Sequence, residues 1–221
     1  MELSDLQFNH KFRYILSVMN NRFAHWQKVY EKTEQEFSWY QSYPETSVKL
    51  IQESRVCLSD PIIDIGGGDS HLVDALLALG YSNLSVLDIS ARAIERAKER
   101  LGELSQKIKW IVSDVLAFKP AEKFAVWHDR ATFHFLVEEA NVVEYRENVA
   151  TAIRHEGKFI LGAFSINGPS KCSGLPVLQY SESKMIETFG HDFQKEKCFK
   201  EEHQTPFNTQ QLFQFCLFSK T

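Results

Sequence analysis

The sequence has no apolar run approaching the roughly 18 residues that a membrane-spanning helix needs, so it predicts no membrane segment. Its first twenty residues lack the continuous apolar stretch of a secretory signal peptide. An excess of basic charge is also missing. The net charge is −4 and the isoelectric point is near 6.1, which gives no electrostatic reason to expect nucleic acid or a membrane as partner. We therefore expect a cytoplasmic protein.

Cysteine is scarce, and the four residues Cys57, Cys172, Cys198 and Cys216 form no C-x-x-C pair. In a chain without a visible secretory signal, we expect them to be reduced thiols. The eight histidines show no ligand pair at the i, i+4 spacing of a helix, so we expect no metal site. A length of 221 residues, 43% of them hydrophobic, is enough for one globular domain with a small appendage.

Three consecutive glycines, Gly66, Gly67 and Gly68, directly follow the short apolar stretch 62–65. A strand that stops in glycines does so where the backbone must bend or be approached closely. The pattern that follows predicts a helix over 70–79, whose first N–H groups favour polar or anionic ligand atoms. We interpret this turn as the floor of a ligand site.

The rest of the chain alternates between predicted strands and helices. Further strands are expected at 84–88, 108–112, 124–127, 157–164, 193–199 and 210–218, with helices at 47–56, 91–101, 142–154 and 181–189. This alternation predicts an α/β fold: a Rossmann-like, seven-stranded, mostly parallel sheet with helices on both faces. The last two strands, joined through 201–206, would close the sheet with an antiparallel C-terminal strand.

The N-terminal residues carry no strand pattern, and apolar residues recur there at helical spacing, as at 12–19 and 23–30. Residues 37–44 are dense in aromatic side chains. We expect residues 1–45 to form a helical cap or flap and 46–221 to form the main domain. The cap either fills a groove of that domain or closes over a ligand, with Trp39 and Tyr40 nearest to it.

Acidic residues stand at the predicted strand ends. Asp88 ends the second strand, 24 residues after Asp64, and Asp114 follows the third. A carboxylate at the end of the second strand can accept hydrogen bonds from a ribose diol, in a dinucleotide or in an adenosine cofactor. Asp88 could instead cap the next helix, although Ser90 could do so in its place. The dinucleotide-binding motif G-x-G-x-x-G requires a third glycine at the position where this chain has His71, which argues against NAD as cofactor.

Taken together, these strand ends resemble the ordered motifs of class I S-adenosylmethionine-dependent methyltransferases over about residues 45–218. The matching segments are 64–68 (DIGGG), 86–90 (VLDIS), 113–115 (SDV) and 128–131 (HDRA). The segment 26–40 also resembles that of protein-lysine methyltransferases of the elongation-factor type. Residues 129–136 are similar both to that group and to the thiopurine-type small-molecule methyltransferases, so the resemblance leaves the acceptor open.

The resemblance implies S-adenosyl-L-methionine as cofactor, with S-adenosyl-L-homocysteine as product. Asp88 would then take the ribose hydroxyls, Asp114 the adenine amino group, and Asp64 the methionine amine. His128 would offer its backbone carbonyl near that amine, and Tyr40 would close over the site. The full set of expected cofactor-binding residues is Tyr40, Asp64, Gly66, Gly67, Gly68, Asp88, Ile89, Asp114, Val115 and His128.

A sulfonium methyl group needs no further activation, so the protein must align an acceptor, exclude water and, for some acceptors, remove a proton. The candidate catalytic residues are Asp129, His134 and His128, all at or just after the end of the fourth strand. His134 could equally be a packed histidine between two phenylalanines. Asp129 could equally cap a helix or pair with Arg130.

The acceptor we expect is a nucleophilic N, O or S atom of a small molecule. A protein lysine side chain is the alternative; nucleic acid is disfavoured because residues 128–131 lack the Pro-Pro-aromatic motif of amino-methylating nucleic-acid enzymes. A protein of another class, one that binds the cofactor without catalysis, would carry the same motifs. We expect a monomer or a homodimer.

Overall fold

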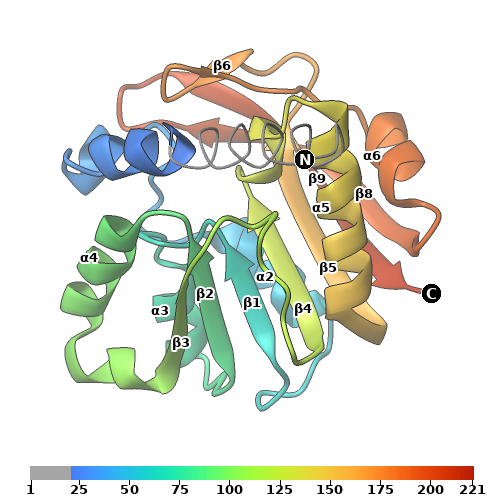
Figure 1. Cartoon of the computed structure of the whole chain (residues 1–221), viewed down its shortest axis with the longest axis horizontal. Helices are drawn as coiled ribbons and strands as arrows, with labels where there is room; N and C mark the ends of the chain where they lie inside the picture. Colours follow the sequence, from blue (N-terminus) through green and yellow to red (C-terminus); the bar gives the residue numbers. More distant parts are fainter. Residues whose placement is uncertain (1–20) are drawn as a thin grey trace, which may run out of the picture.

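A computed structural model describes residues 21–221 of the chain, so the predicted helical pattern at 12–19 and the first twenty residues of the expected 1–45 cap lie outside the described residues. Its centre is a seven-stranded sheet in the order β3-β2-β1-β4-β5-β9-β8 (Figure 1). The first five strands in this order are paired in parallel, and β9 is antiparallel to both of its neighbours. The predicted Rossmann-like fold with an antiparallel C-terminal strand is therefore confirmed.

The strands of this sheet are β1 (Ile62–Ile65), β2 (Leu84–Asp88), β3 (Ile108–Val112), β4 (Phe124–Arg130), β5 (Ile153–Phe164), β8 (Phe193–Gln204) and β9 (Gln210–Lys220). The α-helices are α2 (Glu45–Glu53), α3 (Leu72–Ala78), α4 (Ala91–Leu101), α5 (Glu139–Ala152) and α6 (Glu182–Phe189). Short 3₁₀ helices are η1 (Glu34–Glu36), η2 (Gly102–Lys107) and η3 (Phe133–Phe135), and residues 21–29 are helical. Strands β2 and β3 and helix α4 have the predicted bounds, whereas β4, β5 and β8 are longer.

Helices cover both faces of the sheet, and strands β1, β2 and β4 are therefore buried almost throughout. On one face α2 and α3 pack against side chains such as Val86 and Ile160. On the other face α5 and α6 pack against Trp127 and Phe159. The carboxyl ends of the parallel strands are left uncovered by these helices, which makes that edge available for a site.

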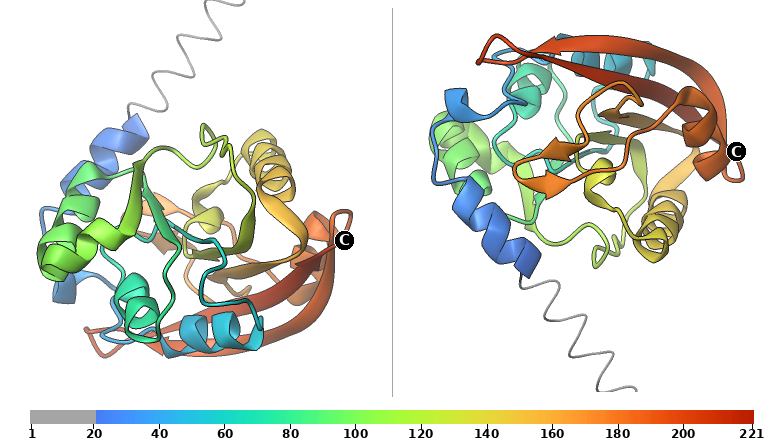
Figure 2. Two further views of the ribbon diagram at one scale, coloured as in Figure 1. Left: turned by 90° about the horizontal axis from the view of Figure 1, so that it is seen from below. Right: turned by 90° about the horizontal axis from the view of Figure 1, so that it is seen from above.

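Two further segments lie at this edge of the sheet. A two-stranded hairpin, β6 (Lys171–Cys172) and β7 (Leu175–Pro176), lies between the predicted strand 157–164 and the predicted helix 181–189, where the sequence predicted neither a strand nor a helix. Figure 1 shows it above the sheet together with the helical residues 21–29, and the right-hand view of Figure 2 shows both from that side. The hairpin is tied to η3, because Leu178 N donates to the carbonyl of His134 at 2.8 Å. Together these segments form a roof over the strand ends.

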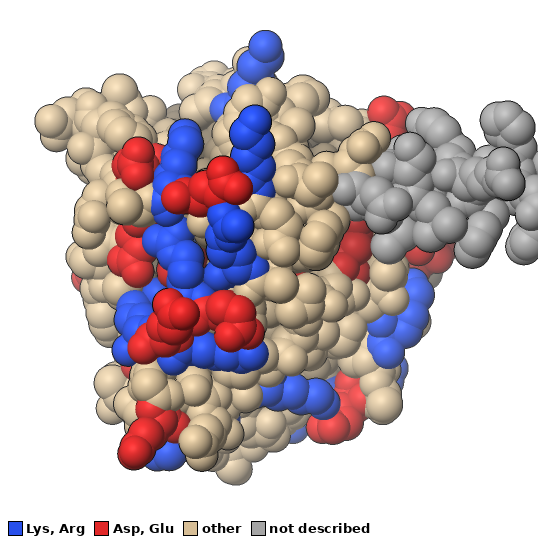
Figure 3. All heavy atoms as spheres, turned by 60° about the vertical axis from the view of Figure 1, so that its left-hand side comes forward, with Lys and Arg blue, Asp and Glu red and all other residues tan. Residues whose placement is uncertain are grey.

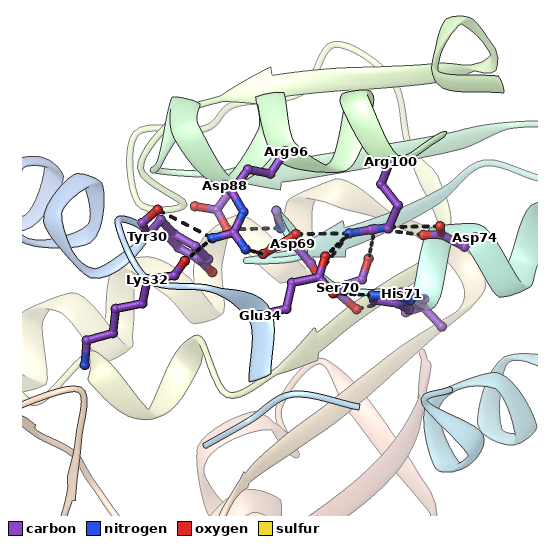
Figure 4. A network of polar contacts seen from close by, with 12 residues as sticks. Tyr30, Lys32, Glu34, Asp69, Ser70, His71, Asp74, Asp88, Arg96 and Arg100 are labelled. Atoms are coloured by element: carbon purple, nitrogen blue, oxygen red, sulfur yellow. Dashed lines mark hydrogen bonds and ion pairs between the residues drawn. The ribbon is translucent and has the colours of Figure 1, made fainter. Parts of the chain in front are cut away.

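Residues 30–34, which follow the helical part of the roof, are held in place by Arg96 and Arg100 of α4. Although the pattern of this charged helix puts both among its outer residues, their side chains reach to this segment and to Asp69 (Figure 4). Arg96 donates to the backbone carbonyl of Lys32 at 2.6 Å and lies 3.1 Å from Asp69. Arg100 donates to Asp69 at 3.0 Å and forms an ion pair with Glu34 at 3.6 Å. Two arginines of one helix thus connect the glycine turn with the segment above it.

Two of the four cysteines are not the reduced thiols that the sequence predicted. Cys198 of β8 and Cys216 of β9 stand directly opposite each other and are joined by a disulfide, with their Cα atoms 4.2 Å apart. Residues opposite each other at the close positions of an antiparallel ladder come within reach of such a bond. Cys57 and Cys172 are free thiols.

The surface over α4 carries both signs of charge. Figure 3 shows acidic and basic side chains interleaved on this face, with no large patch of one sign in view. Such a face neutralises itself and does not provide the field that attracts a polyanion. None of the helices within residues 21–221 is both long and apolar enough to cross a membrane.

Candidate active site

Two adjoining cavities lie under the roof at the carboxyl ends of the parallel strands. The first borders the ends of β2 and β3, and the second borders the glycine turn. They share Tyr30, Trp39, Gly66 and Arg130. Of the ten expected cofactor-binding residues, nine line one or both cavities: Tyr40, Asp64, Gly66, Gly67, Asp88, Ile89, Asp114, Val115 and His128. Gly68, the last glycine of the turn, lines neither cavity.

The glycines of the turn are required by side chains of the protein itself. Gly66 has φ +66°, and a Cβ there would overlap the hydroxyl of Thr132. A Cβ at Gly67 would overlap the carboxylate of Asp64, and one at Gly68 would come within 2.6 Å of Asp88. Because these glycines have no side chains, the carboxylates of Asp64 and Asp88 can lie directly against the turn, where a ligand can contact them.

Asp88 is held by two backbone donors. Its carboxylate accepts from Gly68 N at 3.0 Å and from Ser90 N at 2.7 Å. The helix cap is Ser90, whose hydroxyl accepts from Ala93 N at 3.3 Å, so capping α4 is not the role of Asp88. Burial raises the pKa of Asp88 to about 7, against the lowering effect of the two hydrogen bonds. A ligand hydroxyl donating to this carboxylate would favour its charged form.

Asp114 lies just after β3 with its side chain 4% exposed. One oxygen accepts from Leu116 N at 2.9 Å. The other lies 3.0 Å from the guanidinium of Arg22, in an ion pair that lacks good hydrogen-bond geometry. An arginine of the roof therefore occupies the oxygen that a ligand amino group would use.

His128 forms a buried chain with the neighbouring strand and with α2. It stands opposite Asp64 in the β1–β4 pairing, and its Nδ1 lies 2.7 Å from the Asp64 carboxylate. Its Nε2 lies 2.9 Å from the hydroxyl of Ser47. If Nδ1 carries the proton and donates to Asp64, Nε2 accepts from Ser47. Both ring nitrogens thus have partners, and the pair borders the second cavity.

Asp129 and His134, the other two candidate catalytic residues, line neither cavity. Asp129 is fully buried and accepts from Thr132 N at 2.9 Å, Phe133 N at 3.2 Å and the hydroxyl of Tyr145 at 2.6 Å. Burial raises its pKa to about 6, although these donors act in the opposite sense. Its contacts fix the turn that follows β4.

His134 is buried in an aromatic environment, with its ring centroid 4.6 Å from that of Phe135 and 4.5 Å from that of Phe164. Its Nδ1 accepts from the backbone N–H of Phe164 at 3.3 Å. Burial lowers its pKa to about 3, so the ring is neutral near pH 7.

Several lining residues were not predicted from the sequence. Trp26 of the roof packs edge-on against Phe135, with ring centroids 5.0 Å apart. Arg130, at the end of β4, borders both cavities and does not pair with Asp129. The sequence signal for Arg130 was its place in the segment 128–131, which resembles the methyltransferase motifs. Within the described residues, no cluster of three or more histidine, cysteine or acidic side chains could hold a metal ion.

Comparisons with known proteins agree with this geometry. Residues 62–157 match the family model described as a methyltransferase domain. The chain is 23% identical over 161 residues to mouse EEF1A lysine methyltransferase 2, covering 63% of this chain and 62% of that protein. It is 24% identical over 144 residues to the eEF1A lysine and N-terminal methyltransferase homolog of Drosophila melanogaster, covering 62% of this chain and 21% of that protein. The chain thus matches less than two thirds of the length of these relatives.

Solved structures share the whole fold. A methyltransferase from Anabaena variabilis superimposes with a TM-score of 0.72 at 14% identity, covering 92% of this chain and 95% of that one. The N-methyltransferase NodS from Bradyrhizobium japonicum, in complex with S-adenosyl-L-homocysteine, gives a TM-score of 0.65 at 17% identity, covering 88% and 97%. The family match over residues 62–157, the strand order and these structures together support the fold of class I S-adenosylmethionine-dependent methyltransferases for this chain.

The residues present fit the cofactor of this class, S-adenosylmethionine. The first cavity offers two acids, Asp88 and Asp114, as acceptors for ligand hydroxyl and amino donors. Its neighbouring walls, Leu87, Ile89 and Val115, are apolar and suit a flat ring. One Asp114 oxygen makes no hydrogen bond within residues 21–221 and is met only by the ion pair with Arg22, so it can serve as acceptor for a ligand amino group that displaces Arg22.

Proposed function

We propose that the protein transfers a methyl group from S-adenosylmethionine to a nucleophilic N, O or S atom of a small-molecule acceptor. The observation that carries this proposal is the aromatic contact over the first cavity, where Trp26 of the roof packs against Phe135. A partly covered cavity with aromatic walls suits a small acceptor that is largely surrounded by protein and kept from water.

In this proposal the first cavity holds the nucleoside and the second holds the amino-acid end of the cofactor. Asp88 accepts from the ribose hydroxyls, and Asp114 accepts from the adenine amino group once Arg22 has moved away. The Asp64–His128–Ser47 chain stiffens the wall of the second cavity and directs a carboxylate toward the ligand amine.

The cofactor supplies a sulfonium methyl group, a strong electrophile, when it is bound. The protein then has to hold an acceptor in line and exclude water. We propose that Asp129 and His134 contribute from behind the site. Asp129 anchors the turn that carries Arg130, and His134 supports Phe135, which lines the first cavity. His128 would act through Asp64.

A protein lysine side chain is the second candidate acceptor. It is favoured by the names of the two curated relatives above, both of which are described as lysine methyltransferases. A third relative is described as a malonyl-[acyl-carrier protein] O-methyltransferase, with 27% identity over 104 residues. Relatives of this kind therefore differ in both the acceptor and the acceptor atom.

The first test is calorimetric titration of the protein with S-adenosylhomocysteine and, under the same conditions, with NAD. Micromolar binding of S-adenosylhomocysteine alone is expected. Transfer from methyl-labelled S-adenosylmethionine would then be measured to a panel of small thiols, amines and hydroxyl compounds and, in parallel, to lysine-containing peptides. Transfer of label to small acceptors supports the proposal. Transfer to peptides alone overturns it in favour of a protein lysine side chain as the acceptor. Binding without any transfer would favour a non-catalytic cofactor-binding protein.

A further inference from the structure

The guanidinium group of Arg130 is incompletely paired. Its Nη1 donates to the backbone carbonyl of Trp39 at 3.1 Å. Its Nε and Nη2 are shielded from solvent and have no hydrogen-bond partner among residues 21–221. The group also lies over the ring of Phe213, with Cζ 4.8 Å from the ring centroid. Buried donors of a cation are costly to leave unpaired, so this arrangement calls for a partner that the described chain does not supply.

The surroundings do not neutralise the charge at close range. No acidic side chain within the described chain forms an ion pair with Arg130; Asp64 and Glu201 act on it only from farther away. The nearby histidines His134 and His203 have lowered pKa values, about 3 and about 4, through burial and through the charge of Arg130 itself. Burial lowers the pKa of Arg130 only to about 10, so the group is a cation near pH 7.

Arg130 lies on the other half of the site from Asp88 and Asp114, the two acids proposed to bind the nucleoside of the cofactor. Asp88 ends β2 and Asp114 follows β3, both on one side of β1, whereas Arg130 ends β4 on the other side. Its stacking partner, Phe213, belongs to β9. Cys172 of the hairpin and Phe135 line the same cavity. The second cavity already has Ser70, His71 and Gln41 for the polar end of the cofactor.

We propose that Arg130 recognises a carboxylate or a comparable oxyanion on the methyl acceptor, so that the natural acceptor is an anionic small molecule. This inference rests on the proposed function, because only a methyltransferase has a methyl acceptor. The planar guanidinium presents a fork of N–H donors that suits a carboxylate. The aromatic side chains Trp26, Trp39 and Phe135 suit an apolar or ring-bearing body on the same molecule.

The test uses benzoate and benzamide, two probes of nearly the same shape that differ in charge. Both are titrated into protein saturated with S-adenosylhomocysteine. We expect the wild-type protein to bind benzoate about 10- to 100-fold more tightly than benzamide, the usual range for a hydrogen bond to a charged group. The Arg130→Met variant should lose this preference, and Arg130→Lys should keep only part of it. Arg154→Met, which removes an exposed arginine paired with Asp60, is the matched control and should behave as wild type.

A second titration distinguishes the acceptor from the cofactor as the source of the oxyanion. S-adenosylhomocysteine carries a carboxylate, whereas 5′-methylthioadenosine lacks the amino-acid portion. Equal affinities of wild type and Arg130→Met for S-adenosylhomocysteine support the proposal. A loss of affinity for S-adenosylhomocysteine alone, with 5′-methylthioadenosine unaffected, would overturn the assignment to the acceptor.

An equal preference for benzoate in wild type and Arg130→Met would also overturn the proposal. If Arg130→Met does not fold, the comparison rests on Arg130→Lys, for which an undiminished preference has the same meaning. Failure of wild type to bind S-adenosylhomocysteine would instead contradict the proposed function, and the benzoate comparison on the cofactor-free protein would still test Arg130.

Discussion

The carboxylate of Asp88 accepts a hydrogen bond from the backbone N–H of Gly68 at 3.0 Å, across 20 residues of sequence. This contact joins the end of β2 to the glycine turn and fixes one oxygen of the acid. The same carboxylate borders the first cavity. The most direct predictions about the cofactor therefore concern this residue.

Replacing Asp88 by alanine should weaken binding of S-adenosylhomocysteine about 10- to 100-fold, because hydrogen bonds to a charged group contribute about 1.5–3 kcal/mol. Calorimetry on the folded variant measures this. Asp60→Asn is the control, since Asp60 pairs with Arg154 away from both cavities. Unchanged affinity in Asp88→Ala would show that the carboxylate only orders the turn.

Cofactor binding should release a proton near pH 7 and should tighten as the pH rises from 6 to 8. Burial raises the pKa of Asp88 to about 7, so the free protein holds the acid partly protonated there, and ligand hydroxyl donors favour the charged form. The linked stability effect has the opposite sign: the raised pKa favours folding at low pH, and this contribution is lost as the pH rises through about 7.

Titrations at pH 7 in two buffers of different ionisation enthalpy would measure the released protons. Asp88→Asn cannot titrate at this position, so any release that persists in this variant belongs to another group. Identical proton release in wild type and variant would contradict the assignment to Asp88.

Replacing Arg22 by alanine should tighten cofactor binding several-fold. The guanidinium of Arg22 lies 3.0 Å from the Asp114 oxygen that is otherwise without a hydrogen bond, so a ligand amino group must displace it. A partly exposed ion pair of this kind contributes up to about 1 kcal/mol, or about fivefold in affinity. Weaker binding by Arg22→Ala would mean that the arginine holds the ligand and does not compete with it. Arg92→Ala, which removes an exposed ion pair with Glu31, is a suitable control.

Breaking the disulfide between Cys198 and Cys216 should lower the free energy of unfolding. Closing a loop of this size in the unfolded chain is worth about 3 kcal/mol. Urea unfolding with and without a thiol reductant measures the difference, and peptide mapping without reduction should recover the linked peptides. Cys57→Ser should leave the midpoint unchanged, because Cys57 is exposed and free. Recovery of two free thiols at 198 and 216 would contradict the prediction.

Local signals predicted most of the fold. Helix α4 begins at the residue after Ser90, whose hydroxyl caps it, and the apolar spacing that follows marks its whole length. The acids Asp88 and Asp114 were recognisable because each stands at the end of an apolar strand. These features depend on neighbours in the sequence, which is why they could be read from it.

The missed features depend on partners distant in the sequence. Arg96 looks like any outer residue of a charged helix until the carbonyl of Lys32, 64 residues away, comes to lie against it. Cys198 and Cys216 meet only because β8 and β9 pair in one particular register. Arg130 looked like the ionic partner of Asp129, but successive residues of a strand face opposite ways, so the two acquire different surroundings.

The ties from α4 to Glu34, Lys32 and Asp69 have a practical consequence for anyone who prepares this protein. Trimming the chain at residue 45 would remove Tyr30 and Phe37 and so expose the part of α4 against which they pack. It would also leave Arg96 without the carbonyl it now binds. Residues 21–40 should therefore be retained, intact and without an affinity tag inserted among them, in any version used to search for the acceptor.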